Sequence, residues 1–153
     1  MFSAVLSADQ TDKASRALSK TEGASYKGCY QLTLGRWWPW GFGEDTKFVT
    51  PPNRVELSPD LGTSGFEKSE LLIRAIPAAS TQKTDGVGRP RASFWEVQPG
   101  NRVNLFWTDG FTGVTLNLVK QGNELTGWAH PHFDAVPLIP RIAHVKAKTI
   151  PCR

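Results

Sequence analysis

A chain of 153 residues is long enough to form one domain with a core of its own. Its 39% of hydrophobic and 21% of charged residues exclude an intrinsically disordered chain, and no apolar run approaches the roughly 20 residues of a membrane helix. The net charge of +4 comes from scattered basic residues, whereas a nucleic-acid-binding protein concentrates them on one face. We therefore expect neither a transmembrane segment nor a nucleic-acid partner, while attraction to anionic lipid or polysaccharide stays open.

The first part of the chain differs in composition from the rest. Residues 1–25 are polar and rich in Ser, Ala, Thr and Lys, which is typical of a flexible N-terminal arm. Residues 26–153 are expected to form a single β domain.

Alternation of apolar and polar residues predicts eight strands in this domain. In chain order they cover 29–34, 53–58, 70–76, 92–98, 101–108, 111–120, 124–130 and 142–151. Pro99-Gly100, a two-residue hairpin turn at Asp109-Gly110, and Gln121-Gly122-Asn123 connect the fourth to seventh strands into a meander. Each strand has one apolar face, so we predict an all-β, eight-stranded antiparallel up-and-down barrel, with a two-sheet sandwich as the alternative.

The two cysteines lie at the two ends of the folded region. Cys29 begins the first strand and Cys152 follows the last one. These strands are antiparallel neighbours in a closed barrel, so both cysteines fall at the same end and we predict a disulfide between them. Their spacing matches no zinc pattern, and a disulfide indicates an oxidising compartment: secreted, periplasmic or in the cell envelope.

The side chains expected inside the barrel are apolar. Tyr30, Trp95 and Trp107 are the aromatic members, and we single them out as candidates for ligand contact. The last two strands contribute small residues at their inward positions, namely Gly127, Ala129, Ala143 and Ala147. A wall of small residues can border a cavity for one small ligand, or it can interdigitate with larger side chains into a solid core.

An aromatic segment with interspersed Pro and Gly follows the first strand. Trp37, Trp38, Trp40 and Phe42 cannot belong to a regular helix there, and exposed aromatic side chains mark a binding surface. We consider three roles for them: a lid over the barrel mouth, a stacking platform for sugar rings, or a loop that plugs the barrel.

One short cluster has the donor atoms of a metal site. His130 and His132 share a side of an extended chain, and Asp134 can add an oxygen ligand, although two histidines beside prolines also occur by chance. We find no nucleophile motif and no phosphate-binding loop. No catalytic residue and no cofactor is therefore predicted, and we expect a non-enzymatic protein.

The pattern resembles the calycin superfamily of lipocalins, fatty-acid-binding proteins and avidins. Gly28-Cys29-Tyr30 stands where lipocalins open their first strand with Gly-x-Trp, Thr108-Asp109-Gly110 is similar to the lipocalin Thr-Asp-Tyr turn, and Arg141 precedes the last strand. The chain also resembles small, uncharacterised, envelope-associated bacterial proteins over about residues 28–152. The shared features are an opening Cys-Tyr, a Trp-x-x-Gly-Phe-x-Gly-Val hairpin matching Trp107 to Val114, and a closing Cys. This resemblance implies a calycin-like fold and no known activity.

Our first hypothesis is a monomeric protein that binds a small hydrophobic molecule within the barrel or under the aromatic segment. The alternative is a solid-core interaction module that holds an envelope component, a protein or a glycan, through its Trp-rich loop.

Overall fold

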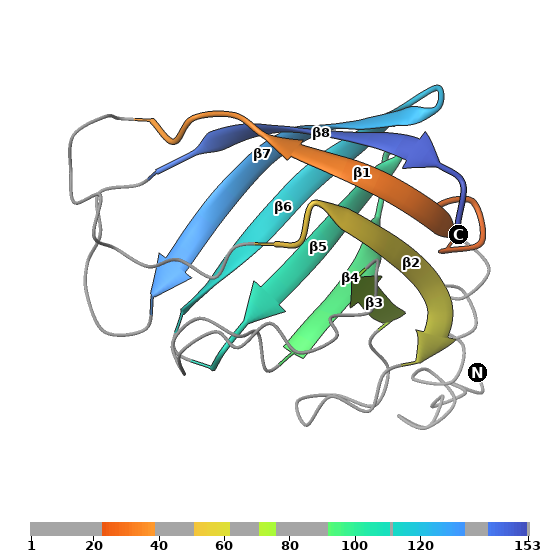
Figure 1. Ribbon diagram of the computed structural model, residues 1–153, viewed down its shortest axis with the longest axis horizontal. Coiled ribbons are helices and arrows are strands. Elements are labelled where there is room, and N and C mark those ends of the chain that lie inside the picture. The colour runs from red at the N-terminus through yellow and green to blue at the C-terminus, as the bar shows by residue number, and fades with distance from the viewer. Residues whose placement is uncertain are drawn as a thin grey trace, which may run out of the picture.

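The structure, a computed structural model, describes residues 23–38, 51–61, 71–75, 92–110, 112–133 and 141–152. Eight antiparallel strands form a closed barrel in which consecutive strands are neighbours and β1 pairs with β8 (Figure 1). The strands are β1 (Gly28–Leu34), β2 (Arg54–Leu61), β3 (Leu71–Ala75), β4 (Ala92–Gln98), β5 (Arg102–Thr108), β6 (Thr112–Gln121), β7 (Glu124–Phe133) and β8 (Ala143–Ile150). Within the described ranges, no helix has the length and apolar character needed to cross a membrane.

The closed barrel confirms the fold that the alternation predicted, and the β1–β8 pairing excludes the two-sheet sandwich. The turn between β5 and β6 differs from the prediction. The last paired residues are Thr108 and Gly113, so the expected two-residue turn at Asp109-Gly110 is wrong. Gly110 has a φ of 101°, and the Asp109 carboxylate accepts hydrogen bonds from the Thr112 amide at 2.7 Å and the Thr112 hydroxyl at 3.0 Å. Together with a 3.0 Å bond from the Asp109 amide to the Thr112 carbonyl, these bonds close the connection between Asp109 and Thr112, beyond the predicted turn.

The apolar face of each strand points into the barrel, as the period of two requires. Among the described residues, twenty hydrophobic side chains are buried, and nineteen of them form one core cluster. The largest fully buried members are Trp95 and Trp107. The small residues of β8, Ala143 and Ala147, are as fully buried as the large ones, so this wall is in contact with other side chains.

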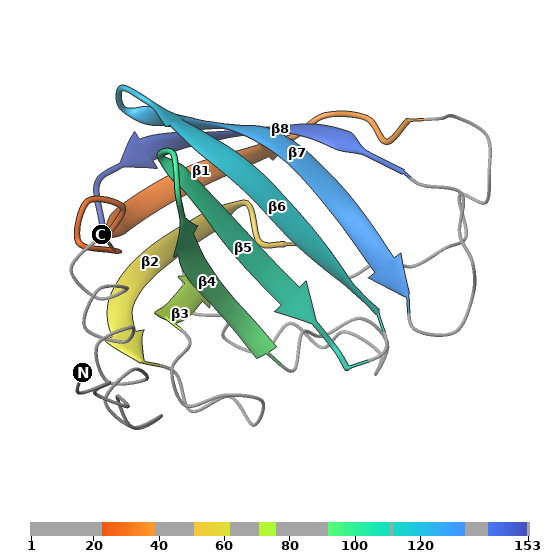
Figure 2. The ribbon, with the colours of Figure 1, turned by 180° about the vertical axis from the view of Figure 1, so that it is seen from behind.

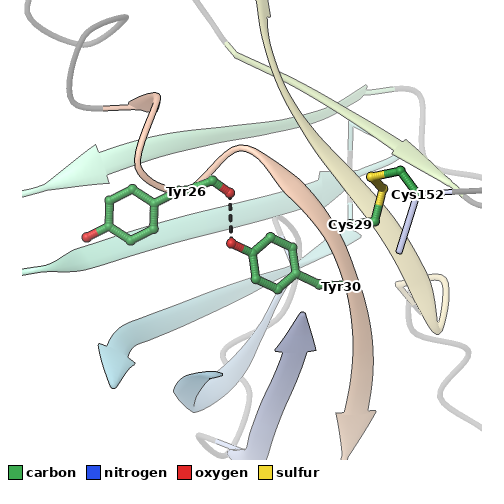
Figure 3. The surroundings of a disulfide bond; sticks show 4 residues. All are labelled: Tyr26, Cys29, Tyr30 and Cys152. Atoms are coloured by element: carbon green, nitrogen blue, oxygen red, sulfur yellow. Dashed lines mark hydrogen bonds between the residues drawn. A yellow bond between two sulfur atoms is a disulfide. The ribbon is translucent and has the colours of Figure 1, made fainter. Parts of the chain in front are cut away.

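The disulfide joins the two strands that close the barrel. Cys29 pairs in register with Ile150, and Cys29 and Cys152 are bonded with their Cα atoms 5.3 Å apart (Figure 3). This Cα separation lies in the usual range for a disulfide. The prediction of a Cys29–Cys152 bond is thus confirmed, and the bond fastens the seam at the end where β1 begins.

The two ends of the barrel differ. At one end β4 joins β5, and β6 joins β7, through the short turns at 99–101 and 122–123 (Figures 1 and 2). The disulfide lies at this end as well, where β1 begins and β8 ends. At the other end β1, β3, β5 and β7 terminate, and β1 continues into 35–38 beside the start of β8. Binding residues tend to gather on the longer connections of a rigid scaffold, so we expect them at this second end.

Replacing both cysteines by serine is expected to lower the free energy of unfolding by about 2 to 4 kcal/mol, because the 123-residue separation leaves a long loop unconstrained in the unfolded chain. Urea unfolding of the Cys29→Ser/Cys152→Ser variant measures this loss, and the reduced wild-type protein is the matched control. If the variant unfolds at the same urea concentration as the oxidised wild type, the disulfide does not stabilise the pairing of β1 with β8.

Candidate functional site

The end of the barrel near the disulfide is filled by the residues that precede β1. Residues 23–26 form a turn, with the Tyr26 amide bonded to the Gly23 carbonyl at 3.0 Å, and Tyr26 is buried. A Cβ on Gly23 would meet the Trp95 ring at 3.1 Å, so the turn lies directly against the core. The predicted arm over 1–25 lies outside the described residues except for its last three, which belong to this turn.

We call residues 23–26 the plug, and two side chains hold it in place. The Tyr30 hydroxyl donates a 2.8 Å hydrogen bond to the Tyr26 carbonyl, as Figure 3 shows. The Lys120 ammonium donates to the Ser25 carbonyl at 2.6 Å and lies 5.2 Å from the centre of the Tyr26 ring. Lys120 ends the inward row of β6, so it covers the plug with a charged group that stays at the surface. Alternation alone could not indicate this contact, since it depends on a segment without periodicity.

The three aromatic residues predicted inside the barrel all lie in its core. Trp95 is 0% exposed, and Trp107 and Tyr30 are also buried. The Trp95 indole N–H donates to the carbonyls of Ser58, at 2.9 Å, and Leu72, at 3.2 Å. These bonds hold Trp95 across β2 and β3 and satisfy its polar atom, which is how a buried Trp is normally accommodated.

The interior of the barrel is filled where the structure describes it. The nineteen side chains of the core cluster, contributed by all eight strands and by Tyr26, have exposures of 0–5%, and the inward Leu34 and Val97 are partly buried against them. A void large enough to hold a ligand would leave the side chains around it exposed, and these side chains are buried. The sequence left a hollow barrel and a solid core open, and the packing favours the solid core.

The opposite end carries two of the predicted tryptophans. Trp37 is half-buried against the core, while Trp38 is 64% exposed. Trp38 exchanges two backbone hydrogen bonds with Ile142, of 2.8 and 3.0 Å, which extend the β1–β8 seam past the end of β1. The backbone of Trp38 is therefore fixed although its side chain faces solvent. Trp40 and Phe42 lie outside the described residues.

The predicted metal cluster is only partly described. His130 and His132 are exposed residues of β7, and Asp134 lies outside the described residues. The His132 ring covers Gly113 on β6, where a Cβ would collide with it. In the ranges that the structure describes, no three His, Cys, Asp or Glu side chains come together as a metal-binding group. The metal site at His130, His132 and Asp134 stays a prediction.

A row of side chains on the outer face of β4 to β8 was not among the predicted sites. The strand register places Glu96, Asn104, Asn117, Trp128 and His144 side by side, one from each strand. Trp128 is 48% exposed, and its ring meets that of His144 edge-on at 5.5 Å. The sequence did hold a signal for it, because Trp128 stands at an outward position between the inward Gly127 and Ala129.

Gly127 explains how β7 lies so close to β6 beside Trp128. A Cβ on Gly127 would fall on the backbone carbonyl oxygen of Asn117. Only glycine allows such a close backbone approach in the interior of a strand. Gly127 is one of the four small inward residues of the last two strands, and this close approach explains why the position holds a glycine.

Comparisons of the chain with models of protein families, with curated proteins and with solved structures find no match. The closed eight-stranded antiparallel barrel is compatible with the calycin-like fold that the resemblance implied. The resemblance to bacterial envelope proteins stays a prediction.

The burial of Tyr30 beside the plug predicts that the stability of the protein depends on pH. Burial, and secondly the neighbouring Tyr26 phenol, raises the pKa of Tyr30 above the ordinary tyrosine value. The neutral phenol is favoured in the folded state, so its contribution to stability is complete below about pH 10 and is lost as the pH rises through the raised pKa.

Tyr30→Phe is expected to cost about 1 to 3 kcal/mol at neutral pH, because the buried Tyr26 carbonyl loses its donor. The difference in unfolding free energy between wild type and variant should shrink above about pH 10. Urea unfolding of both proteins across this range measures it, and a difference that stays constant would show that the Tyr30 phenol is not buried and bonded in this way.

Proposed function

We propose that this chain is a non-enzymatic, monomeric binding protein of an oxidising compartment, secreted or in the cell envelope. It holds a small hydrophobic ligand at the end of the barrel where Trp37 and Trp38 lie. The sequence offered two locations for such a ligand, the barrel interior and the underside of the aromatic segment, and the second is the one proposed.

The observation that supports this choice is the contrast between buried and exposed tryptophans. Trp95 and Trp107 are 0% and 1% exposed, and a ligand could reach them only by displacing core side chains. Trp38 is 64% exposed on a backbone held by two hydrogen bonds. In this proposal Tyr30, Trp95 and Trp107 serve the core, and the aromatic segment binds.

A fixed, exposed indole suits an apolar ligand for two physical reasons. It offers a large contact area, and its aromatic body gains free energy when a partner removes it from water. Because the Trp38 backbone is already held by Ile142, little conformational entropy remains to be lost on binding. Trp37, packed against the core, gives the apolar surface a continuation toward the barrel.

The interaction module remains the second candidate, and the same exposure of Trp38 favours it. A solid barrel that presents an aromatic side chain can hold a protein or glycan of the envelope as well as a small molecule. The two candidates differ in the size of what binds, so one comparison separates them.

The test measures binding of a naphthalene-sulfonate probe and of a fatty-acid series to the wild type and to Trp38→Ala. We expect saturable probe binding that fatty acids displace, and at least a tenfold loss of affinity in Trp38→Ala, because the exposed indole supplies most of the contact. Trp128→Ala removes an exposed Trp on another surface and is the matched control.

Wild-type affinity in Trp38→Ala would refute binding at this end of the barrel. Failure of every hydrophobic compound to bind would refute the small-ligand proposal and leave the interaction module, which capture of an envelope component that depends on Trp38 would then support.

A further inference from the structure

The outer face of β4 to β8 is hollowed by a groove that the proposed function does not use. Its volume is about 530 Å³. The strands that form it lie side by side in Figure 2. The residues that line it include Gln98, Arg102, Asn104, Asn117, Trp128 and His144.

Trp128 gives this groove one rigid apolar surface. Trp128 is 48% exposed, and the His144 ring on the neighbouring strand contacts its ring at an interplanar angle of 87°. The other exposed apolar side chain in the lining is Val119, and polar side chains surround both. The Trp128 ring matches the face of a sugar ring, whose C–H groups pack on an aromatic plane while its hydroxyls meet the polar groups beside it.

The rest of the row presents polar groups that are already oriented. The Asn117 side chain donates from Nδ2 to the side-chain Oδ1 of Asn104 at 2.8 Å. The Asn104 Nδ2 in turn donates to the Glu96 carboxylate at 3.2 Å. In the described part of the chain each of these amide nitrogens uses one of its two hydrogens, so each can still donate to a ligand. Sugar hydroxyls both donate and accept hydrogen bonds, as side-chain amides do. The row of five side chains spans about 19 Å, because neighbouring strands lie about 4.8 Å apart.

The charges around the groove favour an acidic ligand. Arg102 is part of the lining, and none of the described lining residues carries a carboxylate, while the Glu96 carboxylate lies beside the lining residue Asn104. The Arg102 Nε–H donates to the Pro99 carbonyl at 2.9 Å, which fixes the guanidinium while its terminal nitrogens can pair with a carboxylate. Lys146 lies next to the lining residue Thr126 on the exposed face of β8. The Glu96 carboxylate accepts hydrogen bonds from both Asn104 and Gln98, so this negative group is already paired within the row.

We propose that this groove binds a polysaccharide that carries carboxylated sugar rings. Trp128 stacks on one ring, Asn104 and Asn117 bond hydroxyls, and Arg102 pairs with a carboxylate. The inference goes beyond the proposed function, because it concerns another surface, another ligand class and another tryptophan.

The test is electrophoresis in native gels with and without polygalacturonate. Polyglutamate is the control polymer, because it carries carboxylates without sugar rings. We expect polygalacturonate to retard the wild type more strongly than polyglutamate does. Trp128→Ala should lose at least tenfold in affinity, while Trp38→Ala, with its substitution at the end of the barrel, should bind as the wild type does.

Asn117→Ala is a second variant whose exposed side chain is not needed for folding, and we expect about a fivefold loss from one missing amide hydrogen bond. Urea unfolding confirms that each variant is folded. Equal retardation by polyglutamate, unchanged affinity in both Trp128→Ala and Asn117→Ala, or no retardation by polygalacturonate would each overturn the proposal. Binding of the hydrophobic probe is independent of Trp128, so the two proposals can fail separately.

Discussion

The pairing of β1 with β8 is the constraint on which the rest of the molecule depends. It turns a meander with two free edges into a barrel without any, which removes the unpaired backbone groups that invite aggregation. The disulfide fastens one end of this seam, and the Trp38–Ile142 bridge extends it at the other. The same seam therefore stabilises the fold and fixes the backbone of the tryptophan to which we assign binding.

Much of the fold follows from short-range patterns in the sequence. A period of two, interrupted by Pro-Gly and Gly-Asn turns, predicts strands to within a few residues, and β4 is bounded as predicted. Given eight strands in an up-and-down order, Cys29 and Cys152 must come together, so the disulfide follows from topology. The Asp109 turn could not be read in this way, because the two bonds from Thr112 to its side chain decide the loop length.

The candidate sites were less predictable, because they depend on contacts between distant parts of the chain. Alternation identifies which side chains point inward, but whether they leave a hollow depends on how their volumes fit together. The burial of the whole core cluster favours a filled barrel, and this burial does not follow from residue type. Trp128 becomes a candidate binding residue only because the strand register places Asn117 and His144 beside it.

The filled barrel is the central claim, because it moves binding from the interior to the surface. NMR spectroscopy of the methyl groups of Val103, Leu105, Leu116 and Leu118 under xenon pressure tests it most directly, since xenon enters dry apolar cavities. We predict that these methyl signals keep their chemical shifts as the xenon pressure rises. Saturable shifts of the same signals would reveal a cavity inside the barrel, and the ligand would then have to be sought there.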